Sequence, residues 1–237
     1  MVDHSGSSGG HCDDFVFDIF ILNEMQRKMI SFDKIILGSR SPRRRELLSQ
    51  MIPISSIEVI PPQNSEEADF EQLCDLESIR QRLISICKTK NDDVLEQVKQ
   101  STGTLNPILT ADTIVVVGQE DAKYLVLGQP PETGEWEQTV RQWFTDYYAG
   151  KTHRVLTGLC FRSGDQIKTE VVQTLVTFHG IDYVNRYLDW YLSIKESLGK
   201  AGGYAIQESG TIFVQQIEGS LSNVVGLPLE QLVELFH

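Results

Sequence analysis

The sequence lacks a long apolar run and lacks the start of a secreted protein. The longest apolar candidate, residues 15–22, is interrupted by Asp18 and is far shorter than the roughly 20 residues of a membrane-spanning helix. The chain starts Met1-Val2-Asp3 and then becomes rich in glycine and serine, without the cationic start and cleavage site of a signal peptide. We therefore expect a soluble protein with no membrane partner.

Cysteine is scarce, and its spacing favours neither a zinc site nor a disulfide framework. The four cysteines are far apart, with no C-x-x-C pair, and the one adjacent histidine, in His11-Cys12, belongs to the polar N-terminal segment. Disulfides are rare in the reducing cytoplasm. We therefore expect free thiols and a cytoplasmic protein.

Basic residues are outnumbered by acidic ones, 21 to 33, which gives a formal net charge of −12. Nucleic-acid polymers are bound mainly through Lys and Arg that displace counterions, and an anionic surface repels them. This composition excludes a nucleic-acid polymer as the expected partner. A small phosphorylated ligand stays compatible, because a few cations inside a cleft outweigh a distant, screened surface charge.

Strand and helix patterns alternate along the chain, with hairpin turns among them. A polar start followed by a helix-like stripe predicts an N-terminal extension over residues 1–33, partly disordered and then helical. The main body, residues 34–237, should be an α/β fold with a mixed twisted sheet flanked by helices and two lobes around a cleft. Predicted strands cover 34–38, 110–118, 124–128, 154–161, 168–178 and 211–217, and predicted helices cover 42–51, 70–86, 136–147, 181–192 and 228–236.

The motif SRSPRRR follows the first predicted strand and carries three arginines in one helical turn. Ser41 is a suitable N-cap and Pro42 a suitable first helical residue. Arginine there opposes the positive end of the helix dipole, and an anionic ligand would resolve this conflict. We therefore predict a polyphosphate site formed by Ser39, Ser41, Arg43 and Arg44, with a solvated basic helix face as the alternative. A P-loop is not supported, because G-x-x-x-x-G-K-[ST] is absent.

Acidic residues in two places could supply a base or a metal ligand. Asp112 lies in an otherwise apolar strand, where a carboxylate is costly to bury unless a cation or an activated water meets it. Glu66, Glu67 and Asp69 precede the first long helix, and one of them could bind Mg²⁺ together with Asp112. Lys88 could reach a phosphate from that helix. As alternatives, Asp112 would be a turn residue, the three acidic residues would form a solvated loop, and Lys88 would be a surface lysine.

The glycine-rich segment GKAGGYAIQESG permits close backbone approach to a ligand. Gln207 within it offers both a donor and an acceptor, which could read the imide edge of uracil or thymine. His153 and His179 lack a nearby nucleophile pattern, so no catalytic triad is expected.

Four motifs, SRSPRRRELL, TADTIVV, GKAGGYAIQ and IEGSLSNVVGLPLEQL, resemble in sequence and order those of the Maf family of nucleoside triphosphate pyrophosphatases, from about residue 34 to residue 236. The resemblance implies the fold of the inosine triphosphatase-like enzymes, with a nucleotide cleft between two lobes. It also implies hydrolysis between the α and β phosphates that depends on Mg²⁺ or Mn²⁺ and yields a nucleoside monophosphate and pyrophosphate. A homodimer is suggested by the same resemblance.

The family's catalytic aspartate falls on Asp112, which would bind the metal with Glu67, and its specificity residues fall on Arg43, Thr113 and Gln207. The motifs SPRR, ADT and IQ are similar to those of the subgroup that acts on dTTP and UTP. The expected substrates are therefore dTTP and UTP, with modified pyrimidine nucleotides as further candidates. The alternatives are 7-methyl-GTP or other triphosphates, or a nucleotide-binding regulator linked to cell division with weak catalysis.

Two positions depart from the family pattern. Gln129 stands where many members have lysine, which should weaken the hold on the triphosphate unless Lys123 or Lys151 substitutes. Glu208 follows Gln207 in place of a glycine and adds negative charge near the expected base site.

Overall fold

The computed structural model describes residues 32–63, 69–101, 105–132 and 134–237. The predicted N-terminal extension lies almost wholly outside these residues, as do Glu66 and Glu67. Within the described ranges, no helix is long and apolar enough to cross a lipid bilayer.

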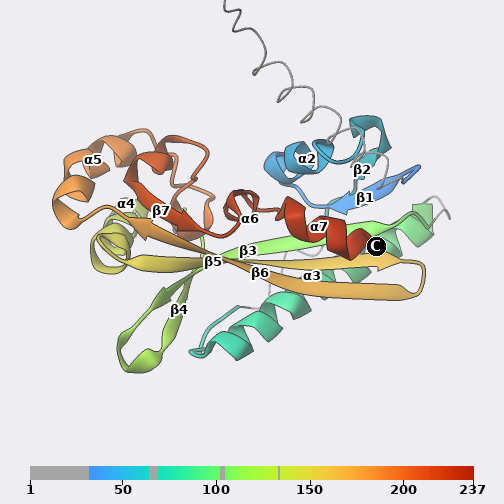
Figure 1. Cartoon of the computed structure of the whole chain (residues 1–237), viewed down its shortest axis with the longest axis horizontal. Coiled ribbons are helices and arrows are strands. Elements are labelled where there is room, and N and C mark those ends of the chain that lie inside the picture. The colour runs from blue at the N-terminus through green and yellow to red at the C-terminus, as the bar shows by residue number, and fades with distance from the viewer. Residues whose placement is uncertain (1–31, 64–68, 102–104, 133) are drawn as a thin grey trace, which may run out of the picture.

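A seven-stranded sheet runs through the whole molecule in the order β2-β1-β3-β5-β6-β7, and β4 pairs with β3 (Figure 1). The strands are β1 (Ile35–Gly38), β2 (Ile57–Val59), β3 (Ile108–Gly118), β4 (Tyr124–Leu127), β5 (Thr152–Ser163), β6 (Gln166–Phe178) and β7 (Val214–Glu218). β1 pairs in parallel with β2 and β3, and the other pairs are antiparallel. The predicted mixed sheet is confirmed.

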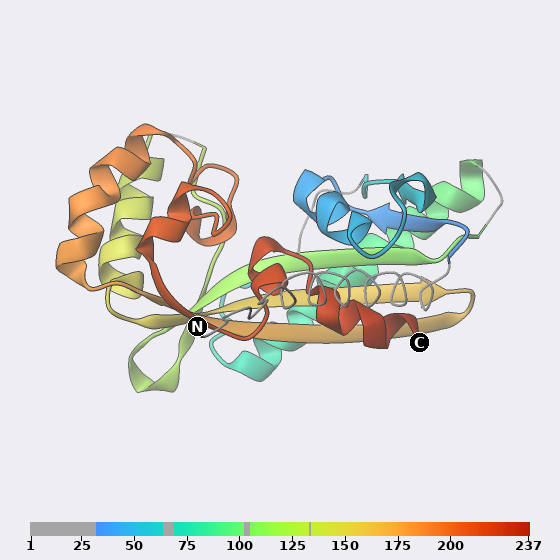
Figure 2. The same ribbon diagram turned by 45° about the horizontal axis from the view of Figure 1, so that its top comes forward.

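Helices cover both faces of this sheet. They are α2 (Pro42–Ser49), α3 (Leu76–Ser101), α4 (Trp136–Gln142), α5 (Ile181–Ser193), α6 (Leu221–Val225) and α7 (Leu229–Phe236), and a wider helical turn, Trp143–Tyr148, continues α4. α3 packs on one face, and α2 and α7 pack on the other. β1, β2, α2 and α7 form one lobe, α4, α5 and β7 form the second, and β3, β5 and β6 run between them (Figure 2).

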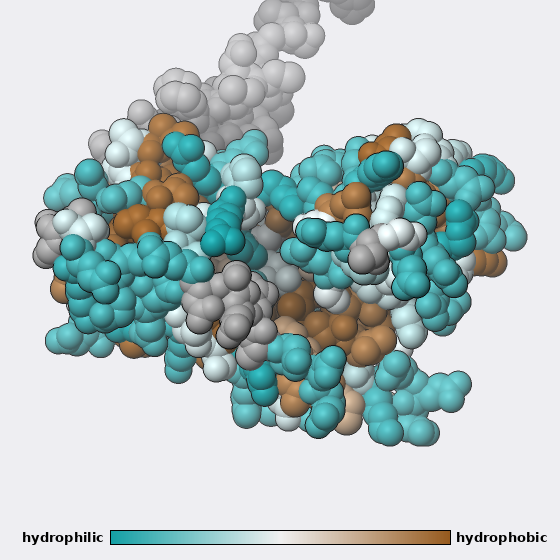
Figure 3. Space-filling view, turned by 180° about the vertical axis from the view of Figure 1, so that it is seen from behind, coloured by the Kyte–Doolittle hydropathy of each residue, from teal (hydrophilic) through white to brown (hydrophobic). Residues whose placement is uncertain are grey.

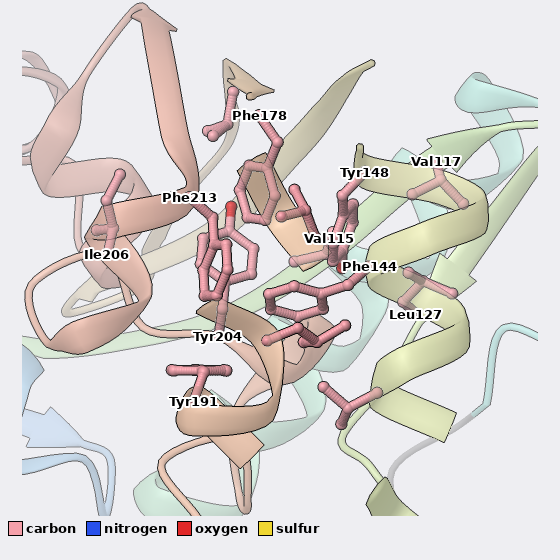
Figure 4. Close-up of a cluster of buried hydrophobic side chains, with 14 of the residues drawn as sticks. Val115, Val117, Leu127, Phe144, Tyr148, Phe178, Tyr191, Tyr204, Ile206 and Phe213 are labelled. Carbon is pink, nitrogen blue, oxygen red and sulfur yellow. The ribbon is translucent and has the colours of Figure 1, made fainter. Parts of the chain in front are cut away.

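The second lobe has an aromatic core (Figure 4). Phe144 is fully buried at its centre and contacts Phe178, Tyr191 and Phe213 at ring-centroid distances of 5.0–5.6 Å. Aromatic pairs at such distances add stabilisation beyond the burial of their area. The strong periodicity of residues 136–147 in the sequence arises because this face packs into that core.

Two predicted elements begin later than expected. The helix predicted from residue 70 begins at Leu76, because the Asp75 carboxylate accepts a hydrogen bond from the Ser78 amide at 2.8 Å and caps the helix there. Phe70 and Leu73 precede the helix and pack beside it. The strand predicted over residues 211–217 begins at Val214, because Ser209–Phe213 forms a short 3₁₀ helix.

His153 is the one histidine that the described residues bury completely, and its burial makes stability depend on pH. Burial lowers its pKa to about 3 from an ordinary value near 6.5, so it is neutral when folded. Its Nε2 lies 2.7 Å from the Tyr204 hydroxyl. Below pH 6.5 the unfolded chain therefore takes up a proton that the native state excludes, and stability falls as the pH is lowered.

We predict that His153→Gln, which can still bond Tyr204, removes this component of acid destabilisation. Wild type should lose up to about 1.4 kcal/mol more per pH unit below 6.5 than the variant does. Urea unfolding between pH 7 and 4.5 measures the difference. Val176→Ala, at the position paired with His153 across β5 and β6, is the matched control and should keep the wild-type slope. Equal slopes for wild type and His153→Gln would contradict the prediction.

Candidate active site

The edge of the central strand β3 is interrupted between β1 and β4. β1 pairs with β3 only as far as Gly38 opposite Thr110, and β4 pairs with β3 from Val115 onwards. On its other side β3 is paired with β5 without interruption from residue 108 to residue 116. Within the described part of the chain, residues 111–114 of β3 therefore have no neighbouring strand on one edge, and Asp112 and Thr113 lie in this gap. Ligands commonly bind at such a point, beyond the carboxyl end of a parallel strand where the connections diverge.

The turn after β1 leads directly into the gap. Ser41 caps α2 by accepting a hydrogen bond from the Arg44 amide at 3.4 Å, as the sequence predicted. The Ser39 hydroxyl accepts the Ser41 amide at 3.1 Å and fixes the turn before the helix. Gly38 is needed here, because a Cβ at this position would lie 2.5 Å from the Thr110 side chain. Close packing of β1 on β3 thus sets where the arginines begin.

Arg44 fills the gap with hydrogen bonds to the protein. Its Nη1 donates to the Ala111 carbonyl at 2.8 Å, and its Nη2 donates to Thr113 Oγ1 at 3.1 Å. Its Nε donates to the Gly226 carbonyl at 2.9 Å, at the end of α6. The guanidinium therefore joins α2, β3 and the C-terminal segment. Direct binding of phosphate by Arg44 stays a prediction, and in this structure these bonds engage most of its donors and give it a role in shaping the site.

A cleft of about 1080 Å³ opens over the gap. One wall comes from the turn after β1, from α2 and from α3, and carries Ser39, Arg40, Ser41, Arg43, Arg44 and Lys90. The opposite wall comes from the end of β4 and from the glycine-rich segment, and carries Gln129, Gly199, Lys200, Tyr204 and Ile206. Figure 3 shows the hollow between the lobes, with apolar surface exposed beside it. The lining also includes apolar side chains such as Ile114, Val115 and Leu127, and a mixture of apolar surface with a few polar groups is typical of a small-molecule site.

Arg43 is the arginine available to a ligand. Arg40 donates to the Pro62 carbonyl at 3.0 Å, and Arg44 is engaged as described. Among the described residues, Arg43 has no hydrogen-bond partner, and it lies on the same cleft as Asp112. The structure therefore brings together the two residues on which the sequence interpretation most depended.

Asp112 faces a lysine that the sequence interpretation missed. Lys90 Nζ donates to Asp112 Oδ1 at 2.6 Å, and the two side chains are only 15% and 13% exposed. Oδ2 has no hydrogen-bond partner among the described residues, so it is the oxygen open to a water or cation. Lys88, predicted for phosphate binding, is exposed and lies off the cleft wall. Two residues turn an α-helix by about 200°, so Lys88 and Lys90 point to opposite sides.

Polar contacts hold α3 where Lys90 can reach Asp112. The buried Asn91 side chain donates to the Ile108 carbonyl at 3.2 Å, and Thr110 donates to the Cys87 carbonyl at 2.8 Å. Gly158, which pairs with Asp112 across β3 and β5, permits close approach of the helix, because a Cβ there would lie 2.9 Å from Cys87 Sγ. The signal that could have found Lys90 is its helical spacing from the buried Leu83, Ile86 and Cys87.

The structure places Thr113 on the cleft wall and Gln207 off it, although both were predicted as specificity residues. Thr113 lines the cleft, and its hydroxyl is fixed by Arg44 and by Thr157 at 2.9 Å. Gln207 is exposed and does not line the cleft, whereas its neighbour Ile206 does. Gln207 therefore lies off the cleft wall in this structure, and its contact with a base stays a prediction.

The fit of the cleft to a divalent cation rests on few ligands. Within the described residues, no three acidic, histidine or cysteine side chains converge on one point. Mg²⁺ is commonly held by one or two carboxylates together with substrate phosphates and water. Asp112 can supply one carboxylate beside the arginine turn, and this fits such a site. The second predicted ligand, Glu67, lies outside the described residues, and Asp69 lines the cleft.

Comparison with known proteins decides the family. Residues 34–237 match the family model described as Maf-like protein. The chain belongs to the Maf family. The mixed sheet with its two lobes is therefore the Maf fold expected from the four motifs.

Curated Maf relatives similar to this chain are named dTTP/UTP pyrophosphatase. The protein of Pyrococcus furiosus is 38% identical over 204 residues, which cover 86% of this chain and 94% of the relative. The protein of Anaeromyxobacter dehalogenans is 36% identical and covers 86% and 93% of the two chains. The protein of Ruminiclostridium cellulolyticum is 35% identical and covers 84% and 92%.

We predict that Arg44→Met lowers the free energy of unfolding by about 2–4 kcal/mol. The substitution removes the hydrogen bonds that Arg44 donates to the carbonyls of Ala111 and Gly226 and to the hydroxyl of Thr113. Arg45→Met, one residue along α2 on its exposed side, is the matched control and should change stability by no more than about 0.5 kcal/mol. Urea unfolding measures both variants. If Arg44→Met were as stable as Arg45→Met, the guanidinium would not be a structural bridge.

Proposed function

We propose that this chain hydrolyses dTTP and UTP to the nucleoside monophosphate and pyrophosphate. The observation that carries the proposal is that Asp112 and Arg43 line one cleft, at the point where the edge of β3 is open. A carboxylate beside a free guanidinium is suited to direct a water at a phosphorus whose oxygens are held by positive charge. The relatives' names agree with this chemistry.

In the proposed reaction, Asp112 Oδ2 orients a water and accepts its proton as the water oxygen bonds to the α-phosphorus. The bond between the α-phosphorus and the oxygen bridging to the β-phosphate breaks, and pyrophosphate leaves with that oxygen. Lys90 holds Oδ1 and thereby fixes the carboxylate. Arg43 balances the charge on the phosphate oxygens. A Mg²⁺ or Mn²⁺ ion held by Asp112 and phosphate oxygens would neutralise charge on the leaving group.

The apolar part of the cleft is proposed to take the pyrimidine and its sugar. Leu125 and Leu127 from β4 face this region together with Tyr204 and Ile206. These side chains supply a surface on which a planar base can pack. Thr113, held by Arg44, sets the shape of the adjoining wall.

The free thiols of Cys87 and Cys160 support a cytoplasmic location. A homodimer stays a prediction, which light scattering in solution would test.

The first test of this function is a panel of dTTP, UTP, CTP and 7-methyl-GTP with Mg²⁺, with the products separated. We expect dTTP and UTP to be cleaved fastest, and Asp112→Asn to lower their turnover by about 100-fold or more. Asp121→Asn, on the exposed β3-β4 turn, is the matched control and should turn over like wild type. Faster cleavage of 7-methyl-GTP would contradict the pyrimidine preference. Thermal stabilisation by nucleotides without any turnover would indicate a binding regulator instead.

The second test compares two lysines of α3. Lys90→Met should reduce kcat by about tenfold to a hundredfold, because Asp112 loses the group that orients it. Lys88→Met removes the same charge from the same helix on its exposed side and should leave kcat within about twofold of wild type. Steady-state release of pyrophosphate measures both. A larger loss in Lys88→Met would restore Lys88 as the functional lysine.

A further inference from the structure

Lys200 is the one basic side chain that the second lobe contributes to the described cleft wall. The other basic lining residues among those described, Arg40, Arg43, Arg44 and Lys90, come from the turn after β1, from α2 or from α3. The backbone segment that carries Lys200 is joined to the segment that carries Gln129, because the Gly202 amide donates a hydrogen bond to the Gly128 carbonyl at 2.9 Å. A ligand that spans the cleft would therefore meet positive charge on both sides.

The backbone around Lys200 is held by buried tyrosines. Tyr148 donates its hydroxyl proton to the Gly202 carbonyl at 2.8 Å, and Tyr191 donates to the Gly203 carbonyl at 3.2 Å. Gly202 has φ +70°, and a Cβ there would lie 2.6 Å from both the Tyr148 hydroxyl and Val115. Only glycine fits this position without displacement. The segment is thus fixed on β3 and in the aromatic core, and it presents Lys200 from a rigid base.

Glu208 partly neutralises this lysine. Its Oε1 lies 3.3 Å from Lys200 Nζ, and the two side chains are 37% and 19% exposed. Glu208 itself is not among the residues that line the cleft. The carboxylate therefore competes for the Lys200 ammonium with any anion that enters the cleft. An ion pair at this exposure is weak enough to be exchanged for a phosphate.

We propose that Lys200 binds the phosphate chain of the nucleotide across the cleft from Arg43, and that Glu208 limits the strength of this contact. The inference rests on the proposed function for the identity of the ligand. When the nucleotide enters, the ammonium exchanges its carboxylate partner for phosphate oxygens. Glu208 thereby lowers nucleotide affinity, and this favours release of the pyrophosphate and the monophosphate after cleavage.

The experiment measures binding and turnover separately. Binding is followed by calorimetry, with a dTTP analogue whose α,β-bridging oxygen is replaced by a methylene group, and turnover is followed by pyrophosphate release from dTTP. The variants are Lys200→Met, Lys200→Arg, Glu208→Gln and the double variant Lys200→Met with Glu208→Gln. Lys195→Met and Glu137→Gln remove the same charges from exposed positions off the cleft and serve as matched controls.

We expect Lys200→Met to raise the Kd of the analogue about tenfold and Lys200→Arg to recover most of this loss. Glu208→Gln should lower the Kd about threefold to tenfold, and this gain should vanish in the double variant. Both controls should bind like wild type. Unchanged Kd in Lys200→Met overturns the proposal, and so does a gain from Glu208→Gln that persists without Lys200.

The two proposals can fail separately. If wild type binds the analogue and shows the Lys200 effects but cleaves no nucleotide, the proposed hydrolysis fails and the lysine assignment stands. If wild type cleaves dTTP while the variants match the controls in Kd, the lysine assignment fails and the proposed hydrolysis stands.

Discussion

The site depends on the unpaired edge of β3 between the end of β1 and the start of β4. A strand edge without a neighbour leaves peptide groups that need partners. Arg44 meets this need at Ala111 with a side chain from α2, and at the same time reaches Thr113 and Gly226. Because a guanidinium occupies the gap in place of a strand, the adjoining space stays open to a ligand, and Asp112 has access to it.

Charge in this molecule is divided between the surface and the cleft. The chain carries a formal net charge of −12, yet five basic side chains of the described residues line the cleft. At physiological ionic strength the surface charge is screened beyond about 8 Å, so local groups decide what binds. Among the same described residues, four acidic ones, Asp69, Glu71, Asp112 and Glu132, line this cleft as well. A divalent cation that enters with the substrate would therefore find carboxylates as well as phosphates.

Most of the fold could be predicted because its patterns are local. The cap at Ser41, the β3-β4 hairpin and the aromatic face of α4 follow from residues close together in the sequence. Of the site, the sequence correctly placed Asp112 and Arg43 on one cleft, because each follows a short local motif at a strand or a helix start. The structural role of Arg44 was missed because its partners, Ala111 and Gly226, lie 67 and 182 residues away. Lys90 was missed because the choice between it and Lys88 depends on how α3 is rotated on the sheet.

The same strand carries both sides of the cleft. Asp112 and Thr113 lie on β3 at the wall formed by α2 and α3, and Val115 supports Gly202 at the opposite wall. Val115 lies three positions after Asp112 on the strand, which corresponds to a distance of about 10 Å. Because β3 is paired with β5 along this whole stretch, that separation cannot change without breaking the sheet. The distance between the carboxylate and the support of Lys200 is therefore fixed before any nucleotide binds, and only side chains remain free to adjust.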